Sequence, residues 1–147
     1  MITDRIRPYA ARLVAEAGAT ISRARLPHYH ADPEATAHKL AALLDAMMTS
    51  LDHHEPLHLA RHVDSLATER FLAGYHVEEV LASFNALESA LWQLLVEVVP
   101  ADTLVRDLGR IGAVLGAGKD QIASRYVELA TQRHSHGVDL RQLEAAL

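Results

Sequence analysis

Apolar residues recur at every third or fourth position over most of the chain, which is the spacing of one face of an α-helix. This pattern predicts an all-α helical bundle of about five helices, with a long helix last. The first helix is expected over residues 4–24, with Thr3 as N-cap and Pro8 early enough to be tolerated. Its core face is Ile6, Ala10, Leu13, Val14, Ala17 and Ile21.

The second helix has a clear start and a continuous apolar face. After a connector at residues 26–31, Asp32 is placed as N-cap and Pro33 as the first helical residue. Proline suits that position because its missing N–H would have no partner inside the helix. The expected core face is Leu40, Leu43, Leu44, Met47, Met48 and Leu51.

The boundaries of the third and fourth helices are predicted from residues that typically start or stop a helix. Asp52 and Glu55 have the spacing of a capping box, so the third helix is expected to start at Asp52. It should end at Gly74, a residue suited to a left-handed C-cap. The fourth helix is expected from His76, with Glu79 reaching back to its start, and should stop before the proline at position 100.

The fifth helix is expected over residues 103–133 and has two unlike faces. A ladder of apolar residues, interrupted at Gly118 and Arg125, consists of Leu104, Leu108, Ile111, Leu115, Ile122 and Leu129. Gly109, Gly112 and Gly116 form a second face, although each interior glycine costs about 1 kcal/mol relative to alanine. Close approach of another helix backbone explains this cost better than a hinge.

Two consequences follow for the end of the chain. We expect the glycine face to contact the same helix of a second subunit in a homodimer, with the fourth helix also contributing to the interface. After residue 133, the chain is expected to form a short linker or signalling helix over residues 134–147. This interpretation divides the chain into a helical sensory domain at 1–133 and a C-terminal segment with Leu140, Leu143 and Leu147.

An arginine falls inside the apolar stripe of the third helix. Arg70 shares that stripe with Leu59, Val63 and Leu66. A charged side chain directed into a core needs a partner, and Glu88 lies at the flank of the apolar stripe of the fourth helix. We therefore expect Arg70 to be at least partly buried and paired with Glu88 or Glu79. The pair would serve either as a structural ion pair or as a latch in a signalling domain.

The residues around Arg70 resemble the RsbR-type sensory domains, the N-terminal domains of RsbT co-antagonist proteins in bacterial stress signalling. The match is greatest over residues 52–95, at Arg70, Gly74, Tyr75, Val77, Glu79 and Val80. The resemblance implies a globin-like fold without haem, a dimer, and the relay of a signal to an output domain. The sequence contains no sulfate-transporter/anti-sigma-antagonist (STAS) output module, so a phosphorylation switch in such a module is not implied.

Composition narrows the class of protein. The 147 residues are half apolar but only 5% aromatic, which suits one helical domain filled by alanine and leucine. A net charge of −5 argues against nucleic-acid binding. There is no cysteine, and no apolar run approaches the roughly 18 residues of a membrane helix. The charged N-terminus lacks the apolar run of a secretory signal, so we expect a cytoplasmic protein without a membrane partner.

Ten histidines are many for this length. His54, His58 and His62 recur at every fourth residue, a spacing that can direct imidazoles toward one metal ion. His28 and His30, in the connector, could add ligands. On a helical projection His62 borders the core while His54 points outward, so a solvated or core-edge role is favoured. A histidine-rich metal-binding bundle remains the alternative function.

Cofactor chemistry and catalysis are not expected. The fourth helix has no histidine beyond its first turn and the fifth has none before His134, so no proximal haem ligand is placed. The segment GAGKD at residues 116–120 lacks the spacing and hydroxyl residue of a P-loop. The sequence favours a dimeric regulatory domain that relays a signal to a partner or output module by repacking helices. A purely structural dimerisation module is a further alternative.

Overall fold

The computed structural model describes residues 2–26, 28 and 32–146, with side chains described up to Arg133. Every regular element in these ranges is helical, which confirms the predicted all-α class. The elements are α1 (Ile2–Ile6), the 3-10 turn η1 (Arg7–Tyr9), α2 (Ala10–Ala24), α3 (Pro33–Asp52), α4 (Leu57–Leu72), α5 (Val77–Val98) and α6 (Ala101–Ala146).

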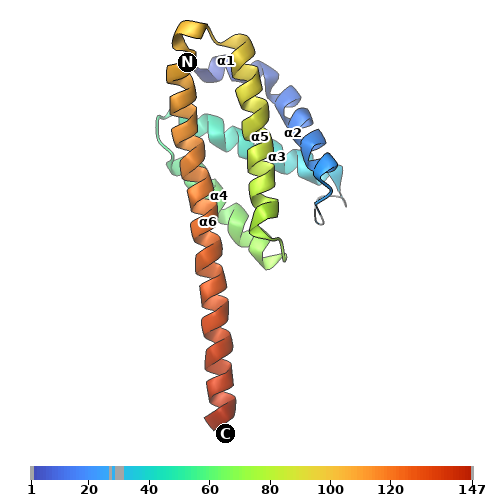
Figure 1. Cartoon of the computed structure of the whole chain (residues 1–147), viewed down its shortest axis with the longest axis vertical. Helices are drawn as coiled ribbons and strands as arrows, with labels where there is room; N and C mark the ends of the chain where they lie inside the picture. Colours follow the sequence, from blue (N-terminus) through green and yellow to red (C-terminus); the bar gives the residue numbers. More distant parts are fainter. Residues whose placement is uncertain (1, 27, 29–31, 147) are drawn as a thin grey trace.

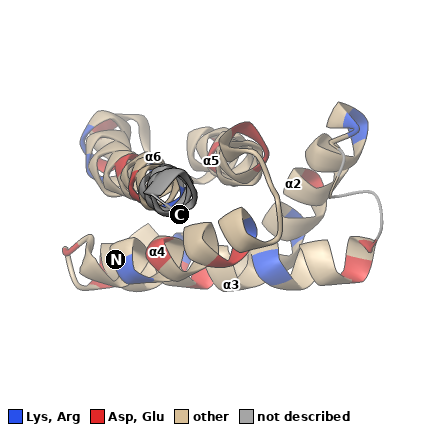
Figure 2. Cartoon of the chain, turned by 90° about the horizontal axis from the view of Figure 1, so that it is seen from below, with Lys and Arg blue, Asp and Glu red and all other residues tan. Residues whose placement is uncertain are grey.

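The helices form two layers. Figure 2 shows α2, α5 and α6 in one layer and α3 and α4 in the other. Within the first layer, α5 runs beside α6 on one side and α2 on the other (Figure 1). The C-terminal part of α6 extends past the other helices (Figure 1). The bundle therefore positions one helix both to form part of the core and to project from it.

The core lies between the layers and contains most of the predicted apolar faces. All six predicted core residues of α3 are buried, as are Ile6, Leu13, Ala17 and Ile21 of α1 and α2. The ladder of α6 is buried in its central part at Ile111, Leu115 and Ile122. The most deeply buried large side chains of α5 are Phe84, Leu87, Leu91, Leu94 and Leu95.

The predicted first helix is wrong in its start and its continuity. Thr3 lies inside α1, and its buried hydroxyl donates to the Asp52 carboxylate instead of capping a helix. Pro8 lies in the 3-10 turn that separates α1 from α2. A proline removes one helical hydrogen bond and its ring collides with the preceding turn, so the helix cannot pass position 8 unchanged.

The predicted capping box at Asp52 is also wrong. Asp52 is the last residue of α3, and α4 begins only at Leu57. The Asp52 carboxylate accepts hydrogen bonds from Thr3 and, at 2.6 Å, from Arg7. A backbone N–H in the first turn of α4 instead finds its acceptor in α3. The Leu59 N–H donates to the buried Ser50 hydroxyl at 2.8 Å.

The remaining predicted helix ends agree with the structure, except for the C-terminal end of α6. The Asp32 side chain caps α3 by accepting from the Ala35 N–H at 3.0 Å. Helix α6 does not end at residue 133, because it continues to Ala146 through Gly137. One interior glycine costs only about 1 kcal/mol and does not end a helix by itself. The predicted leucine contacts at Leu140, Leu143 and Leu147 lie outside the described side chains.

Candidate functional site

The turn between α4 and α5 is fixed by a specific backbone conformation. Gly74 has φ of 86°, in the left-handed region that the sequence predicted for this C-cap. The Tyr75 N–H donates to the Arg70 carbonyl at 2.9 Å, and the Gly74 N–H donates to the Phe71 carbonyl at 3.1 Å. This pair of bonds is a Schellman motif, which satisfies the last carbonyls of α4. It holds Tyr75 directly before the start of α5.

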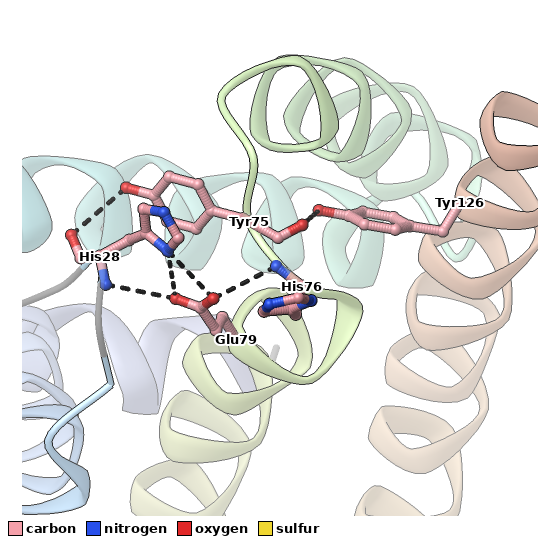
Figure 3. Close-up of polar contacts among 5 residues, drawn as sticks. All are labelled: His28, Tyr75, His76, Glu79 and Tyr126. Atoms are coloured by element: carbon pink, nitrogen blue, oxygen red, sulfur yellow. Dashed lines mark hydrogen bonds and ion pairs between the residues drawn. The ribbon is translucent and has the colours of Figure 1, made fainter. Parts of the chain in front are cut away.

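Glu79 in the first turn of α5 accepts bonds from both sides. It is buried, with 3% of its surface exposed. As predicted, its carboxylate reaches back to the N–H of His76, at 3.2 Å. The same carboxylate accepts from the His28 N–H at 3.3 Å and contacts the His28 Nδ1 at 2.8 Å (Figure 3). Glu79 thereby connects the α2–α3 connector to the start of α5.

The hydrogen bonds decide the charge of this carboxyl group. Burial alone raises the pKa of Glu79, because it disfavours the charged form. The bonds from the His28 side chain and from the N–H groups of His76 and His28 outweigh burial, and the pKa lies below its ordinary value of 4.5. A buried carboxylate with these donors is therefore ionised at neutral pH.

Tyr75 lies between the connector and α6. Its ring stacks on the His28 ring with centroids 4.3 Å apart, and its hydroxyl donates to the His28 carbonyl at 3.4 Å. Its own carbonyl accepts from the Tyr126 hydroxyl of α6 at 3.1 Å (Figure 3). The Arg70 guanidinium lies 4.8 Å from the centre of the Tyr75 ring. We call His28, Arg70, Tyr75, Glu79 and Tyr126 the turn cluster.

The predicted burial of Arg70 is confirmed, and its two predicted carboxylate partners contact other residues. Arg70 is 3% exposed. Glu79 bonds to His28 and His76 instead, and Glu88 forms an ion pair with Lys119 of α6 and accepts from Trp92 at 3.3 Å. Glu88 lies about 13 Å further along α5 than Glu79, at about 1.5 Å per residue. It is therefore too far from the turn to meet an arginine whose guanidinium lies over Tyr75.

The three histidines of the suggested metal site do not share one helix. His54 lies in the turn before α4, with a φ of 53°, while His58 and His62 belong to α4. His62 is half-buried, and burial lowers its pKa while the nearby charge of Asp45 acts in the opposite direction. No group of three or more histidine, aspartate or glutamate side chains suited to a metal ion occurs among the described residues. The helical spacing on which the metal interpretation depended is thus wrong for His54.

The predicted glycine face of α6 is open with respect to the described residues of this chain. A Cβ atom at Gly109 or Gly116 would meet nothing within 4 Å, and one at Gly112 would come only to 4.0 Å from Trp92. The close approach occurs at Gly118, where a Cβ atom would lie 2.9 Å from both Leu59 and Phe84. The sequence pattern placed Gly118 at an interruption of the ladder and did not predict this contact. Its place in the ladder was the signal that it faces the core.

Two residues of the turn cluster escaped the sequence analysis. The sequence pattern does not predict a role for Tyr126, and it suggests His28 only as a metal ligand. The signal for Tyr126 was its position four residues after Ile122 on the buried face of α6. No local signal identifies His28, because its contacts join residues 51 positions apart.

Comparison with known proteins adds no identification. Within the described residues, no helix is long and apolar enough to cross a membrane. No protein-family model, no curated protein and no solved structure matches this chain.

Proposed function

We propose that the chain is a regulatory domain that relays a signal by a change in helix packing, as the resemblance to RsbR-type sensory domains implies. The same proposal includes a globin-like topology, a cytoplasmic location and a role in stress signalling. The recipient of the signal is a partner protein or an output domain. The observation that supports it most is the turn cluster. Through it, the α2–α3 connector contacts the α4–α5 turn, and that turn contacts α6, the helix that projects from the bundle.

The contacts have the chemistry of a switch. The His28 side chain is 35% exposed while that of Glu79 is 4% exposed, so a stimulus at the surface can reach the histidine alone. If His28 leaves, a buried carboxylate loses two donors. A hydrogen bond to a charged group contributes about 1.5–3 kcal/mol, which is the range of allosteric coupling energies. Loss of the contact is therefore large enough to shift the packing of the turn against Tyr126.

Hydrogen exchange on single-residue variants tests the relay. His28→Ala should increase amide exchange in α6 around Tyr126, and Tyr126→Phe should reciprocally increase exchange at His76, because coupling between two sites acts in both directions. His38→Ala, an exposed histidine on α3 outside the cluster, is the matched control. Changes confined to the connector in His28→Ala would contradict the relay.

We further propose that the domain forms a homodimer through the outer stripe of α6. We define this stripe as Val105, Gly109, Gly112, Gly116, Ala123 and Val127, which lie within about 60° on a helical projection at about 100° per residue. Val105 is 79% exposed and Val127 is 65% exposed. Exposed apolar residues flanking glycines form a surface that the backbone of a second helix can approach closely.

Light scattering of the parent protein and its variants tests the dimer. Gly109→Glu adds a large charged side chain where a Cβ atom would meet no described residue within 4 Å, so it should dissociate the dimer without unfolding the monomer. Gly112 is less suitable, because a long side chain there would strike Trp92 of its own chain. Ser124→Glu, exposed and outside the stripe, should leave the mass unchanged. A monomeric parent at high concentration would contradict this part of the proposal.

A further inference from the structure

A groove of about 410 Å³ lies where α1, the α3–α4 turn and α6 meet. Its volume is in the range of small-molecule sites. Its apolar walls include Ile2 of α1, Leu51 of α3, and Ala113 and Val114 of α6. Two nitrogen-bearing side chains, His54 and Arg110, also line it. An apolar groove with few polar groups is the usual composition of a ligand site.

The two polar side chains of this groove have no partner in the described part of the chain. Neither the Arg110 guanidinium nor the His54 imidazole forms a hydrogen bond or ion pair with any described residue. Other exposed arginines do so, such as Arg7 with Asp52 and Arg12 with Glu97. A guanidinium presents its donors as a planar fork that matches a carboxylate. Arg110 therefore offers an anion site directly beside apolar walls.

His54 is held at the groove by a conformation that favours glycine. Helix α3 ends in a Schellman motif, with the Glu55 N–H donating to the Ser50 carbonyl at 3.0 Å and the His54 N–H to the Leu51 carbonyl at 3.3 Å. His54 occupies the left-handed position with φ of 53°, where α4 has Gly74. A histidine is disfavoured there relative to glycine. In return, the turn places an imidazole at the groove.

We propose that this groove binds an amphiphilic monocarboxylate with an unbranched alkyl chain. The carboxylate lies at Arg110 and His54, and the alkyl chain lies along Leu51 and Val114. One permanent positive charge among apolar walls suits a ligand with a single negative charge and a hydrocarbon chain. The site shares no residue with the turn cluster, so it stands independently of the proposed relay.

Calorimetric titration of the full chain with decanoate, below its micelle concentration, tests the site. We expect saturable binding of one decanoate per chain, and at least tenfold weaker binding of decanol and of decyltrimethylammonium. Arg110→Ala should weaken decanoate binding about tenfold or more, which corresponds to about 1.4 kcal/mol. Arg106→Ala, an exposed arginine of α6 that does not line the groove, should bind as the parent does.

Two further variants locate the ligand. Ala113 is exposed and lines the groove, so Ala113→Trp should fill it and abolish binding while the circular dichroism spectrum stays unchanged. His54→Gly should weaken binding several-fold yet raise the melting temperature, because glycine accepts a positive φ without strain. Equal binding of decanol and decanoate, equal affinities of Arg110→Ala and Arg106→Ala, or unchanged binding by Ala113→Trp would each overturn the proposal. So would no saturable binding up to about 1 mM.

Discussion

Replacing Gly118 by alanine tests the packing of α6 against the core most directly. An added Cβ atom would lie 2.9 Å from Leu59 Cδ2, 2.9 Å from Phe84 Cζ and 3.0 Å from Phe84 Cε2. Leu59 and Phe84 are both fully buried, so either side chain can move only against its neighbours in the core. Either α6 must shift outward or the two side chains must shift away from it.

Two opposing effects set the magnitude. Overpacking a well-packed core by one methyl group costs about 1–3 kcal/mol, while alanine in place of glycine stabilises a helix interior by about 1 kcal/mol. Gly118→Ala should therefore lower the free energy of unfolding by about 1 kcal/mol, and up to about 2 kcal/mol if the core does not relax. The same substitution at an uncrowded helical glycine should have the opposite sign.

Gly18 in α2 provides that matched control. A Cβ atom there would meet only Leu40 Cδ1, at 4.0 Å, which is ordinary van der Waals contact. Gly18→Ala should raise the free energy of unfolding by about 0.5–1 kcal/mol. Urea denaturation followed by circular dichroism measures both variants. If Gly118→Ala is as stable as Gly18→Ala, the close approach of α6 to Leu59 and Phe84 is refuted.

Three further substitutions test single contacts. Arg70→Ala should lower the free energy of unfolding by about 2 kcal/mol or more, since it removes a buried side chain and the contact with the Tyr75 ring; an unchanged melting temperature would contradict its burial. Ser50→Ala should cost about 1–2 kcal/mol in urea denaturation, because the Leu59 N–H loses its acceptor, and an unchanged midpoint would show that water replaces the hydroxyl. Glu79 has a lowered pKa in the folded state, so its contribution to stability is present above about pH 4.5 and is lost as the pH falls through the lower pKa of the folded state. Glu79→Gln should therefore flatten this part of the dependence of the unfolding free energy on pH. An unaltered dependence would contradict the bonds to His28 and His76.

Helix faces could be predicted from the sequence because they depend on local periodicity. The core face of α3 from Leu40 to Leu51 follows from the spacing of apolar residues alone, and all of it is buried. The start at Asp32 and the turn at Gly74 follow from residue types whose backbone preferences are strong. At these positions the residue type that favours the local backbone conformation is also the one that the packing of the bundle needs.

The predicted contacts that fail are those in which a residue far away in the sequence binds the side chain that local spacing had assigned to a nearby partner. Asp52 and Glu55 satisfy the spacing of a capping box, but Thr3 and Arg7 bind the Asp52 carboxylate from the first turns of the chain. Likewise, the stripe position of Arg70 indicated burial, whereas the partner of Glu79 is a connector histidine 51 residues away. A pattern of residue types contains no measure of such distances, so the place of His28 in the turn cluster could not be predicted from the sequence.

The ends of α3 and α4 show how a violated sequence rule can point to function. Both helices end in the same pair of Schellman bonds, but the left-handed position is Gly74 in one and His54 in the other. The sequence predicts the end of α4 because Gly74 follows the rule, and it predicts His54 inside a longer helix because the histidine breaks the rule. A residue that is disfavoured by its backbone conformation is retained most readily where its side chain contributes something in return. His54 lines a groove together with Arg110. The contribution of the imidazole can therefore be measured as the ligand affinity that His54→Gly loses, compared with the stability that it gains.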